Sequence, residues 1–307
     1  MSRRSRILAT VVLVGAQAVA VSSAEAAFPG KNGKIYFTEE FATGGKLFSL
    51  AANGRIAGIR GQSRFDASQG RVSSNGRHIV FQSYRNGNSE LYRVRVNGTG
   101  LKRLTRTRDI NEVLPTWSPN GRRIAFQAGL RDSPDQDIYK MRAGGKGVKR
   151  LTTEAGSDGA PAWSPDGRQI AFQTNRPSTD GFDVWVMNAN GSGQRAVTRL
   201  PNNEGEPSWS PDGTRLAISS SVFVPAVGIQ DDIFTVGLDG SGLVQITTDP
   251  ALDFTPAWSP NGRRIAFVSN RAGNFDVHTM RADGTDVRRV TSAPLNETHI
   301  DWAPRKR

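Results

Sequence analysis

The sequence predicts an all-β fold: a six-bladed β-propeller of four-stranded antiparallel blades. A motif of the form P-x-W-S-P-[DN]-G recurs, with its tryptophan at Trp117, Trp163, Trp209 and Trp258, at spacings of 46, 46 and 49 residues. Short alternating stretches and tight-turn sequences fill the chain between the copies, without helical periodicity. A repeat of about 45 residues is the length of one propeller blade.

Each copy contains the strands of one blade in order. The tryptophan ends the first, innermost strand, and Ser-Pro-Asp/Asn-Gly fits a type I turn whose glycine starts the next strand. The second strand is predicted at residues 124–126, 170–172, 216–218 and 265–267, where large side chains alternate with alanine. A third strand such as "DIYKM" and a polar turn such as "NGSG" lead to a fourth strand ending in "RLT" or "QIT".

The ends of the chain predict how the ring closes. A degenerate copy places Val72 45 residues before Trp117, and Trp302 lies 44 residues beyond Trp258. The first copy lacks an inner strand, so we expect residues 298–303 to pair with residues 34–38 and complete blade 1. The six blades then begin near residues 34, 70, 115, 161, 207 and 256, within a domain of residues 28–307. A five-bladed or open arrangement is the alternative, and it would leave "HIDW" as an exposed apolar edge.

One insertion interrupts the repeat. The stretch "SSSVFVPAVGIQDD" lies between the second and third strands of blade 5. We expect it to protrude as a loop.

The N-terminal segment has the pattern of a secretory signal. Arg3, Arg4 and Arg6 precede an apolar run, and Ala24-Glu25-Ala26 is a cleavage motif. We therefore expect residues 1–26 to be a signal peptide, with a periplasmic or secreted mature protein and no transmembrane segment after cleavage. An uncleaved membrane anchor is the alternative, but the run is shorter than the roughly 20 residues that span a bilayer.

Composition excludes several kinds of function. The chain has no cysteine, so it forms no disulfide, thiolate metal site or cysteine nucleophile. Its formal net charge is +12, but the basic residues are scattered through turns such as "GRR". We interpret them as a solvated surface, and since export argues against nucleic acid, we expect no nucleic-acid partner. A monomer is expected.

The repeat resembles those of a known family. The pattern P-x-W-S-P-[DN]-G-x-x-[IL]-A-[FI], followed by a D-[IV]-[YWFH] strand, is similar to the WD-like propeller repeats of the TolB family over residues 28–307. The resemblance implies six blades, a periplasmic location, and binding to the peptidoglycan-associated lipoprotein and other Tol partners. TolB proteins also carry an N-terminal α/β domain, for which this sequence has no room, so a TolB-like propeller alone is expected.

The predicted function is therefore a non-catalytic binding scaffold that engages a protein or cell-envelope component at one mouth of the central tunnel. Propeller peptidases resemble the chain only in the propeller, because a hydrolase domain with a G-x-S-x-G elbow is missing. One alternative is a small-molecule or carbohydrate-binding propeller, and another is a metal-dependent lyase or hydrolase with its site in the tunnel. His78, His278 and His299 fall on different blades, which disfavours a histidine-rich metal centre.

A carboxylate recurs five residues before the anchoring tryptophan. These residues are Glu112, Asp158, Glu204, Asp253 and Glu297, and only blade 2 deviates, with Ala67 at this position. In one interpretation they form an acidic ring at a tunnel mouth, which binds a basic partner segment or a divalent cation such as calcium. In the other, each caps its own inter-blade loop. No other cofactor is expected.

An arginine also recurs, after the second strand. Arg85, Arg176 and Arg271 each lie thirteen residues after the anchor position, and Glu90, Asp183 and Asp276 begin the third strands of the same blades. We expect each arginine to bridge its hairpin to that third-strand carboxylate.

Overall fold

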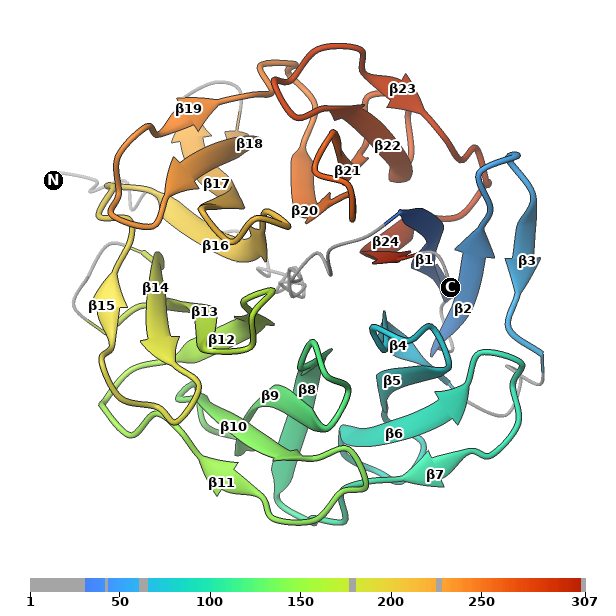
Figure 1. Cartoon of the computed structure of the whole chain (residues 1–307), viewed down its shortest axis with the longest axis vertical. Coiled ribbons are helices and arrows are strands. Elements are labelled where there is room, and N and C mark those ends of the chain that lie inside the picture. Colours follow the sequence, from blue (N-terminus) through green and yellow to red (C-terminus); the bar gives the residue numbers. More distant parts are fainter. Residues whose placement is uncertain (1–30, 42–43, 61–65, 177–180, 225–227, 305–307) are drawn as a thin grey trace, which may run out of the picture.

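The computed structural model describes residues 31–41, 44–60, 66–176, 181–224 and 228–304. Within these ranges every regular element is a β-strand, and the strands form six four-stranded antiparallel sheets. The sheets stand side by side in a ring around a central axis (Figure 1). The predicted all-β, six-bladed propeller is confirmed. The predicted signal peptide, residues 1–26, lies outside the described residues.

Each blade runs outward from the axis through four strands. The inner strands are β4 (Ser68–Val72), β8 (Ile110–Trp117), β12 (Asp158–Trp163), β16 (Asn203–Trp209), β20 (Asp253–Trp258) and β24 (Glu297–Pro304). The second strands are β1 (Asn32–Phe41), β5 (His78–Ser83), β9 (Arg123–Leu130), β13 (Gln169–Thr174), β17 (Arg215–Val224) and β21 (Arg264–Ser269).

The two outer positions differ strongly in length. The third strands are β2 (Gly44–Leu50), β6 (Glu90–Arg95), β10 (Asp137–Arg142), β14 (Asp183–Asn188), β18 (Gly228–Gly237) and β22 (Asp276–Arg281). The fourth strands are β3 (Ile56–Gly58), β7 (Lys102–Arg103), β11 (Lys149–Arg150), β15 (Arg195–Ala196), β19 (Val244–Gln245) and β23 (Arg288–Arg289).

The two ends of the described chain share one blade. Its strand order is β24-β1-β2-β3, with Ile35 opposite Trp302 and Glu39 opposite Glu297. The predicted closure by the C-terminal strand is confirmed, and "HIDW" is buried rather than exposed at an edge.

The recurrent tryptophans fill the spaces between blades. Trp117, Trp163, Trp209 and Trp258 are at most 2% exposed. The indole Nε1 of Trp209 donates to the carbonyl of Ala162 in the preceding blade, at 3.0 Å. Since a blade exposes two apolar faces, this packing is what makes the blades depend on one another.

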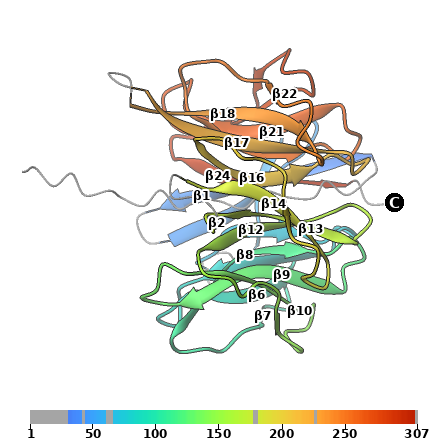
Figure 2. The ribbon, with the colours of Figure 1, turned by 90° about the vertical axis from the view of Figure 1, so that its left-hand side faces the viewer.

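The insertion in blade 5 is a longer hairpin rather than a loop. Strands β17 and β18 stay paired up to Val224 and Gly228, beyond the point where the other blades turn. The hairpin reaches out from the disc at the upper left of Figure 2. The loop prediction is wrong because the inserted segments are rich in β-branched residues, which extend the ladder.

Candidate functional site

The disc has two different faces. Two kinds of tight turn lie on one face: those that join the first strand to the second, and those that join the third strand to the fourth. In blade 2 the two turns are hydrogen-bonded to each other, since the backbone N of Val96 in the second turn donates to the carbonyl of Arg77 in the first at 3.0 Å. The same bond recurs in the pairs Ala143–Arg122, Ala189–Arg168 and Ala282–Arg263. We call this the turn face; it consists of residues 51–55, 73–77, 96–101, 118–122, 143–148, 164–168, 189–194, 210–214, 238–243, 259–263 and 282–287.

Longer connections lie on the opposite side, which we call the loop face. They join the second strand to the third, or one blade to the next. The two kinds meet in bonds such as Glu112 N to the carbonyl of Ser89, at 3.0 Å. The loop face consists of residues 84–89, 104–109, 131–136, 151–157, 175–176, 181–182, 197–202, 221–224, 228–231, 246–252, 270–275 and 290–296.

The five predicted carboxylates lie where the inner strands begin, at the loop face. Glu112, Asp158, Glu204, Asp253 and Glu297 are all at most 3% exposed. Their contacts are with the preceding loop, their own second strand and the preceding blade. The carboxylate of Glu112 accepts from the hydroxyl of Thr107 at 2.9 Å, and that of Glu297 accepts from Val277 N at 3.3 Å. These are the contacts of loop-capping side chains enclosed between blades.

The two aspartates of this set are ion-paired. The guanidinium of Arg176 donates from Nε to Asp158 at 2.7 Å, and Nη2 of Arg271 donates to Asp253 at 2.5 Å. Both carboxylates are fully buried. A buried carboxylate needs such a partner, because an isolated one loses its hydration without compensation.

The three glutamates lack an arginine and bind hydroxyl groups instead. Glu204 accepts from Ser220 at 3.2 Å, and Glu297 accepts from Thr291. Burial raises the pKa of Glu112, Glu204 and Glu297 to about 7 in each case, against a usual 4.5. These three carboxyl groups therefore change between the protonated and the ionised form near neutral pH.

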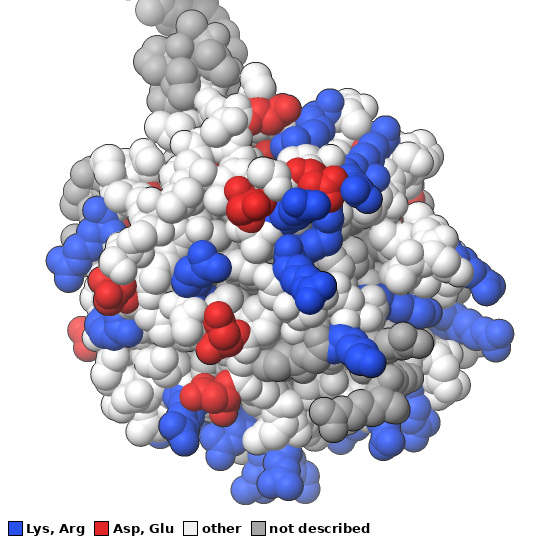
Figure 3. All heavy atoms as spheres, turned by 45° about the horizontal axis from the view of Figure 1, so that its top comes forward, with Lys and Arg blue, Asp and Glu red and all other residues white. Residues whose placement is uncertain are grey.

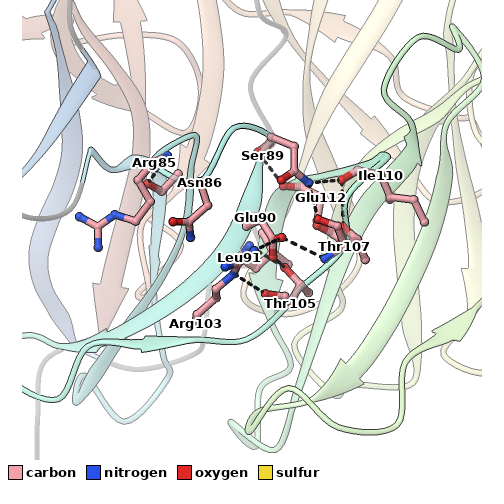
Figure 4. Close-up of polar contacts among 12 residues, drawn as sticks. Arg85, Asn86, Ser89, Glu90, Leu91, Arg103, Thr105, Thr107, Ile110 and Glu112 are labelled. Carbon is pink, nitrogen blue, oxygen red and sulfur yellow. Dashed lines mark hydrogen bonds and ion pairs between the residues drawn. The ribbon is translucent and has the colours of Figure 1, made fainter.

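A second buried carboxylate accompanies each of the five. It lies on the third strand of the preceding blade, and the set is Glu90, Asp137, Asp183, Asp232 and Asp276. Figure 4 shows one such junction, in which Glu90 is bound by Arg103 and by the hydroxyl of Thr105, close to Glu112. The nearby charge of Glu90 adds to burial in raising the pKa of Glu112.

The predicted bridges from hairpin arginines to third-strand acids are not formed. Arg176 and Arg271 turn inward to the inner-strand aspartates. Arg85 points away from Glu90 in Figure 4, and its guanidinium lies 5.4 Å from the ring centre of Tyr92. Two of the three third-strand acids pair instead with fourth-strand arginines, Glu90 with Arg103 and Asp276 with Arg289 at 2.7 Å.

A bulge in every inner strand was not predicted. Three residues before the anchor, each inner strand has a non-glycine residue with φ between 48° and 57°: Gln69, Leu114, Ala160, Glu206, Thr255 and His299. The backbone N of Leu114 donates to Gln82 Oε1 of the preceding blade at 3.1 Å, and Thr255 N donates to Glu206 Oε2 at 2.7 Å. The bulges thus join neighbouring blades around the axis. None of these residues is the glycine or asparagine that ordinarily predicts this conformation.

The histidines stay apart. His78, His278 and His299 lie on β5, β22 and β24, and His299 is buried with its pKa lowered to about 3 by burial. Among the described residues, no group of three His, Asp or Glu side chains is placed to hold a metal ion. In the same ranges, no helix has the length and apolar character to cross a membrane.

Four large apolar side chains are exposed at or beside the loop face. They are Tyr84 (55%), Leu130 (60%), Val222 (38%) and Ile229 (62%), which we call the apolar loop patch. All four lie where a second strand passes into a third, in blades 2, 3 and 5. On the long hairpin of blade 5, Val222 and Ile229 expose apolar surface on both sides of one element, which makes it a candidate interaction surface.

Comparison with solved structures finds the same fold in other proteins. TolB from Acinetobacter baumannii has a TM-score of 0.76 at 19% sequence identity, over 90% of this chain and 68% of that chain. A protein described as TolB, from Agrobacterium tumefaciens, has a TM-score of 0.66 at 20% identity, over 89% and 99%. Hydrazine synthase from Kuenenia stuttgartiensis has a TM-score of 0.73 at 13% identity, over 90% of this chain and 47% of that chain. At these identities the likeness shows the fold alone.

Sequence comparison is more specific. Residues 70–199 and 179–307 match the model of the TolB beta propeller domain. A search of curated proteins finds no match. Since the matched segments cover most of the chain and the fold agrees, this chain belongs to the TolB beta-propeller domain family.

Proposed function

We propose that this protein is a non-catalytic binding scaffold outside the cytoplasm, which engages a protein or cell-envelope partner with its loop face at one mouth of the central tunnel. A propeller of the TolB family supports a binding scaffold in general. The location outside the cytoplasm is supported by the signal-like sequence of residues 1–26 and by the family.

The observation that carries the proposal is the apolar loop patch. Val222 and Ile229 lie on the two strands of the long hairpin, one register step apart, so their side chains expose apolar surface on its two opposite faces. A partner that covers these side chains would gain roughly 25 cal/mol for each Å² of apolar surface that it removes from water. Tyr84 and Leu130 extend the same kind of surface to blades 2 and 3.

The five inner-strand carboxylates are buried below the loop face and do not reach its surface. Their burial and their contacts with Thr107, Ser220 and Thr291 fit a role in holding the loop-face connections beside the patch. We therefore propose a positioning role for them, in place of direct contact with a partner or coordination of calcium. The separate histidines and the absence of a three-residue metal-binding group among the described residues support the non-catalytic part.

Capture from the native envelope with paired variants tests the proposal. We expect Val222→Ser/Ile229→Ser to bind the wild-type protein's partner roughly tenfold more weakly, since central apolar residues dominate interface energetics. The matched control is Leu243→Ser/Val244→Ser, which removes two exposed apolar side chains from the turn-face side of the same blade. Equal capture by both variants and the wild type would contradict the loop face as the binding surface.

A further inference from the structure

Charges are distributed unevenly over the turn face. Residues 73–78, 93–103, 118–123 and 140–150, which belong to blades 2 and 3, contain lysines and arginines but no Asp or Glu. We call these residues the basic sector. Its cations are Arg77, Arg93, Arg95, Lys102, Arg103, Arg122, Arg123, Lys140, Arg142, Lys146, Lys149 and Arg150. In Figure 3, Lys and Arg along the right-hand edge of the molecule have few Asp or Glu beside them, whereas Lys and Arg in the upper middle and on the left lie next to Asp and Glu.

The unevenness comes from single positions of the repeat. The third residue of the first tight turn is Asn75 or Asn120 in blades 2 and 3, but Asp166 or Asp212 in blades 4 and 5. The second tight turn differs likewise, with Asn97 or Gly144 in blades 2 and 3, where blades 5 and 6 have Asp239 or Asp283. Asparagine caps the turn as well as aspartate does: Asn120 Oδ1 accepts from Arg122 N at 3.0 Å, as Asp166 Oδ1 accepts from Arg168 N. Folding therefore does not require the missing acids.

Most charges of the basic sector are left uncompensated. Arg103 and Arg150 are ion-paired with Glu90 and Asp137. By contrast, six exposed residues make no ion pair with any described residue: Arg77, Arg122, Arg123, Arg142, Lys146 and Lys149. A side-chain contact links the two blades in this sector, since Nζ of Lys102 donates to the carbonyl of Gly144 at 3.0 Å. The sector is thus one continuous surface.

The positive charge of the sector affects the pKa of a histidine inside it. His78 is partly buried, and burial followed by the nearby Arg93, Arg95 and Arg77 lowers its pKa below the usual 6.5. An anion bound at the sector would offset the arginine contribution and raise this pKa.

Two aliphatic side chains project among the cations. Leu101 is 37% exposed and Val148 is 53% exposed, at the same turn position of blades 2 and 3. Each directly precedes a lysine, Lys102 or Lys149. Apolar side chains flanked by lysine and arginine on a surface suit the headgroup layer of a bilayer, where the cations meet phosphates and the apolar groups enter between them.

We infer that the basic sector docks the protein on an anionic phospholipid bilayer. Lys146, Lys149 and Arg122 face lipid phosphates, while Leu101 and Val148 enter the headgroup layer. The turn face then lies against the membrane and the loop face points away from it. The inference is independent of the proposed partner site, because the two surfaces are on opposite faces.

Vesicle sedimentation tests the inference. The wild-type chain is mixed with phosphatidylglycerol/phosphatidylcholine vesicles or with pure phosphatidylcholine vesicles. We expect binding to the anionic vesicles only, weakened by salt. Arg122→Gln/Lys146→Gln/Lys149→Gln should bind about a hundredfold more weakly, at roughly fivefold per charge. The control Arg168→Gln/Arg263→Gln/Arg281→Gln removes the same charge from blades 4 and 6 and should change binding less than about fivefold. Equal loss in both triple variants would overturn the inference.

Two further measurements separate a bilayer from a soluble polyanion. Leu101→Ser/Val148→Ser should weaken vesicle binding by about tenfold and leave heparin binding unchanged. Heparin binding as tight as vesicle binding, with vesicle binding unchanged by Leu101→Ser/Val148→Ser, would overturn the bilayer in favour of a soluble polyanion. A pH titration of the histidine NMR signals should give a higher pKa for His78 with phosphatidylglycerol micelles than without them. An unchanged pKa would count against contact at this sector. Unchanged melting temperatures of the variants confirm that they fold.

Discussion

The acid near the start of an inner strand has a different kind of partner according to whether it is aspartate or glutamate. Where it is aspartate, an arginine reaches it, as Arg176 reaches Asp158. Where it is glutamate, the partner is a hydroxyl group, that of Ser220 for Glu204 and that of Thr107 for Glu112, and burial raises the pKa to about 7. The sequence located all these acids by their spacing, but not their partners, because the partner depends on how far each hairpin continues before it turns.

A prediction at the residue scale concerns Glu204→Gln. The pKa of Glu204 is above its usual 4.5 in the folded state, so the folded protein holds this proton more tightly than the unfolded chain does. The resulting stabilisation is complete below pH 4.5 and is lost as the pH rises through about 7. The variant should therefore be more stable than the wild type by about 1 to 3 kcal/mol at pH 8, with a smaller difference at pH 5.

Chemical denaturation across this pH range measures the effect. Asp158→Asn is the control, because it leaves Arg176 buried without its carboxylate and should destabilise at pH 8. A Glu204→Gln protein less stable than the wild type at pH 8 would show that the carboxylate is ionised and stabilised in the fold.

Among the elements, the fourth strand is the shortest and is held in part by side-chain contacts. It is only two residues long in five of the six blades. In those blades a buried threonine follows it, and in blade 3 the hydroxyl of Thr152 accepts from Ile138 N at 2.9 Å and donates to Asp137 at 3.2 Å. The threonine of the recurring "RLT" and "QIT" endings is the residue that makes this contact. The strands could be predicted from their alternation, whereas the purpose of the final threonine depends on a neighbouring strand that no local pattern specifies.

A pair of variants at this threonine tests its role. Thr152→Val keeps the shape but leaves a buried backbone N–H and a carboxylate without their hydroxyl partner, which should cost about 1 to 3 kcal/mol of unfolding free energy. Thr152→Ser keeps the hydroxyl and should cost less. Hydrogen exchange should show faster exchange of Ile138 N–H in the valine variant alone, and equal exchange in both would contradict the assignment.

For the whole molecule, closure of the ring decides stability. Strand β24 covers the free edge of β1 and places Trp302 opposite Ile35, in a cluster that includes Val268 of blade 6. This closure could be predicted because two incomplete copies of one repeat complement each other. The uneven charge of the turn face could not, because acidic residues separate its four segments along the chain, and the segments share one surface only when the blades stand side by side.

Removal of the last strand tests this closure. A chain that ends at residue 295 lacks β24, so β1 becomes an open edge beside exposed apolar side chains. We expect loss of cooperative thermal unfolding and self-association, measured by calorimetry and light scattering. Adding a peptide of residues 296–307 should restore a monomeric, cooperatively unfolding complex. A truncated protein that already melts like the full chain would show that the ring does not need its closing strand.

Asn32 and Pro304 are neighbours in the first blade. A short linker between them would turn the chain into a covalent circle, which could be cut open again at any other connection. Such circular permutants would keep every blade contact while moving the new termini to either face, so that a label or tether could be placed beside whichever surface is under study.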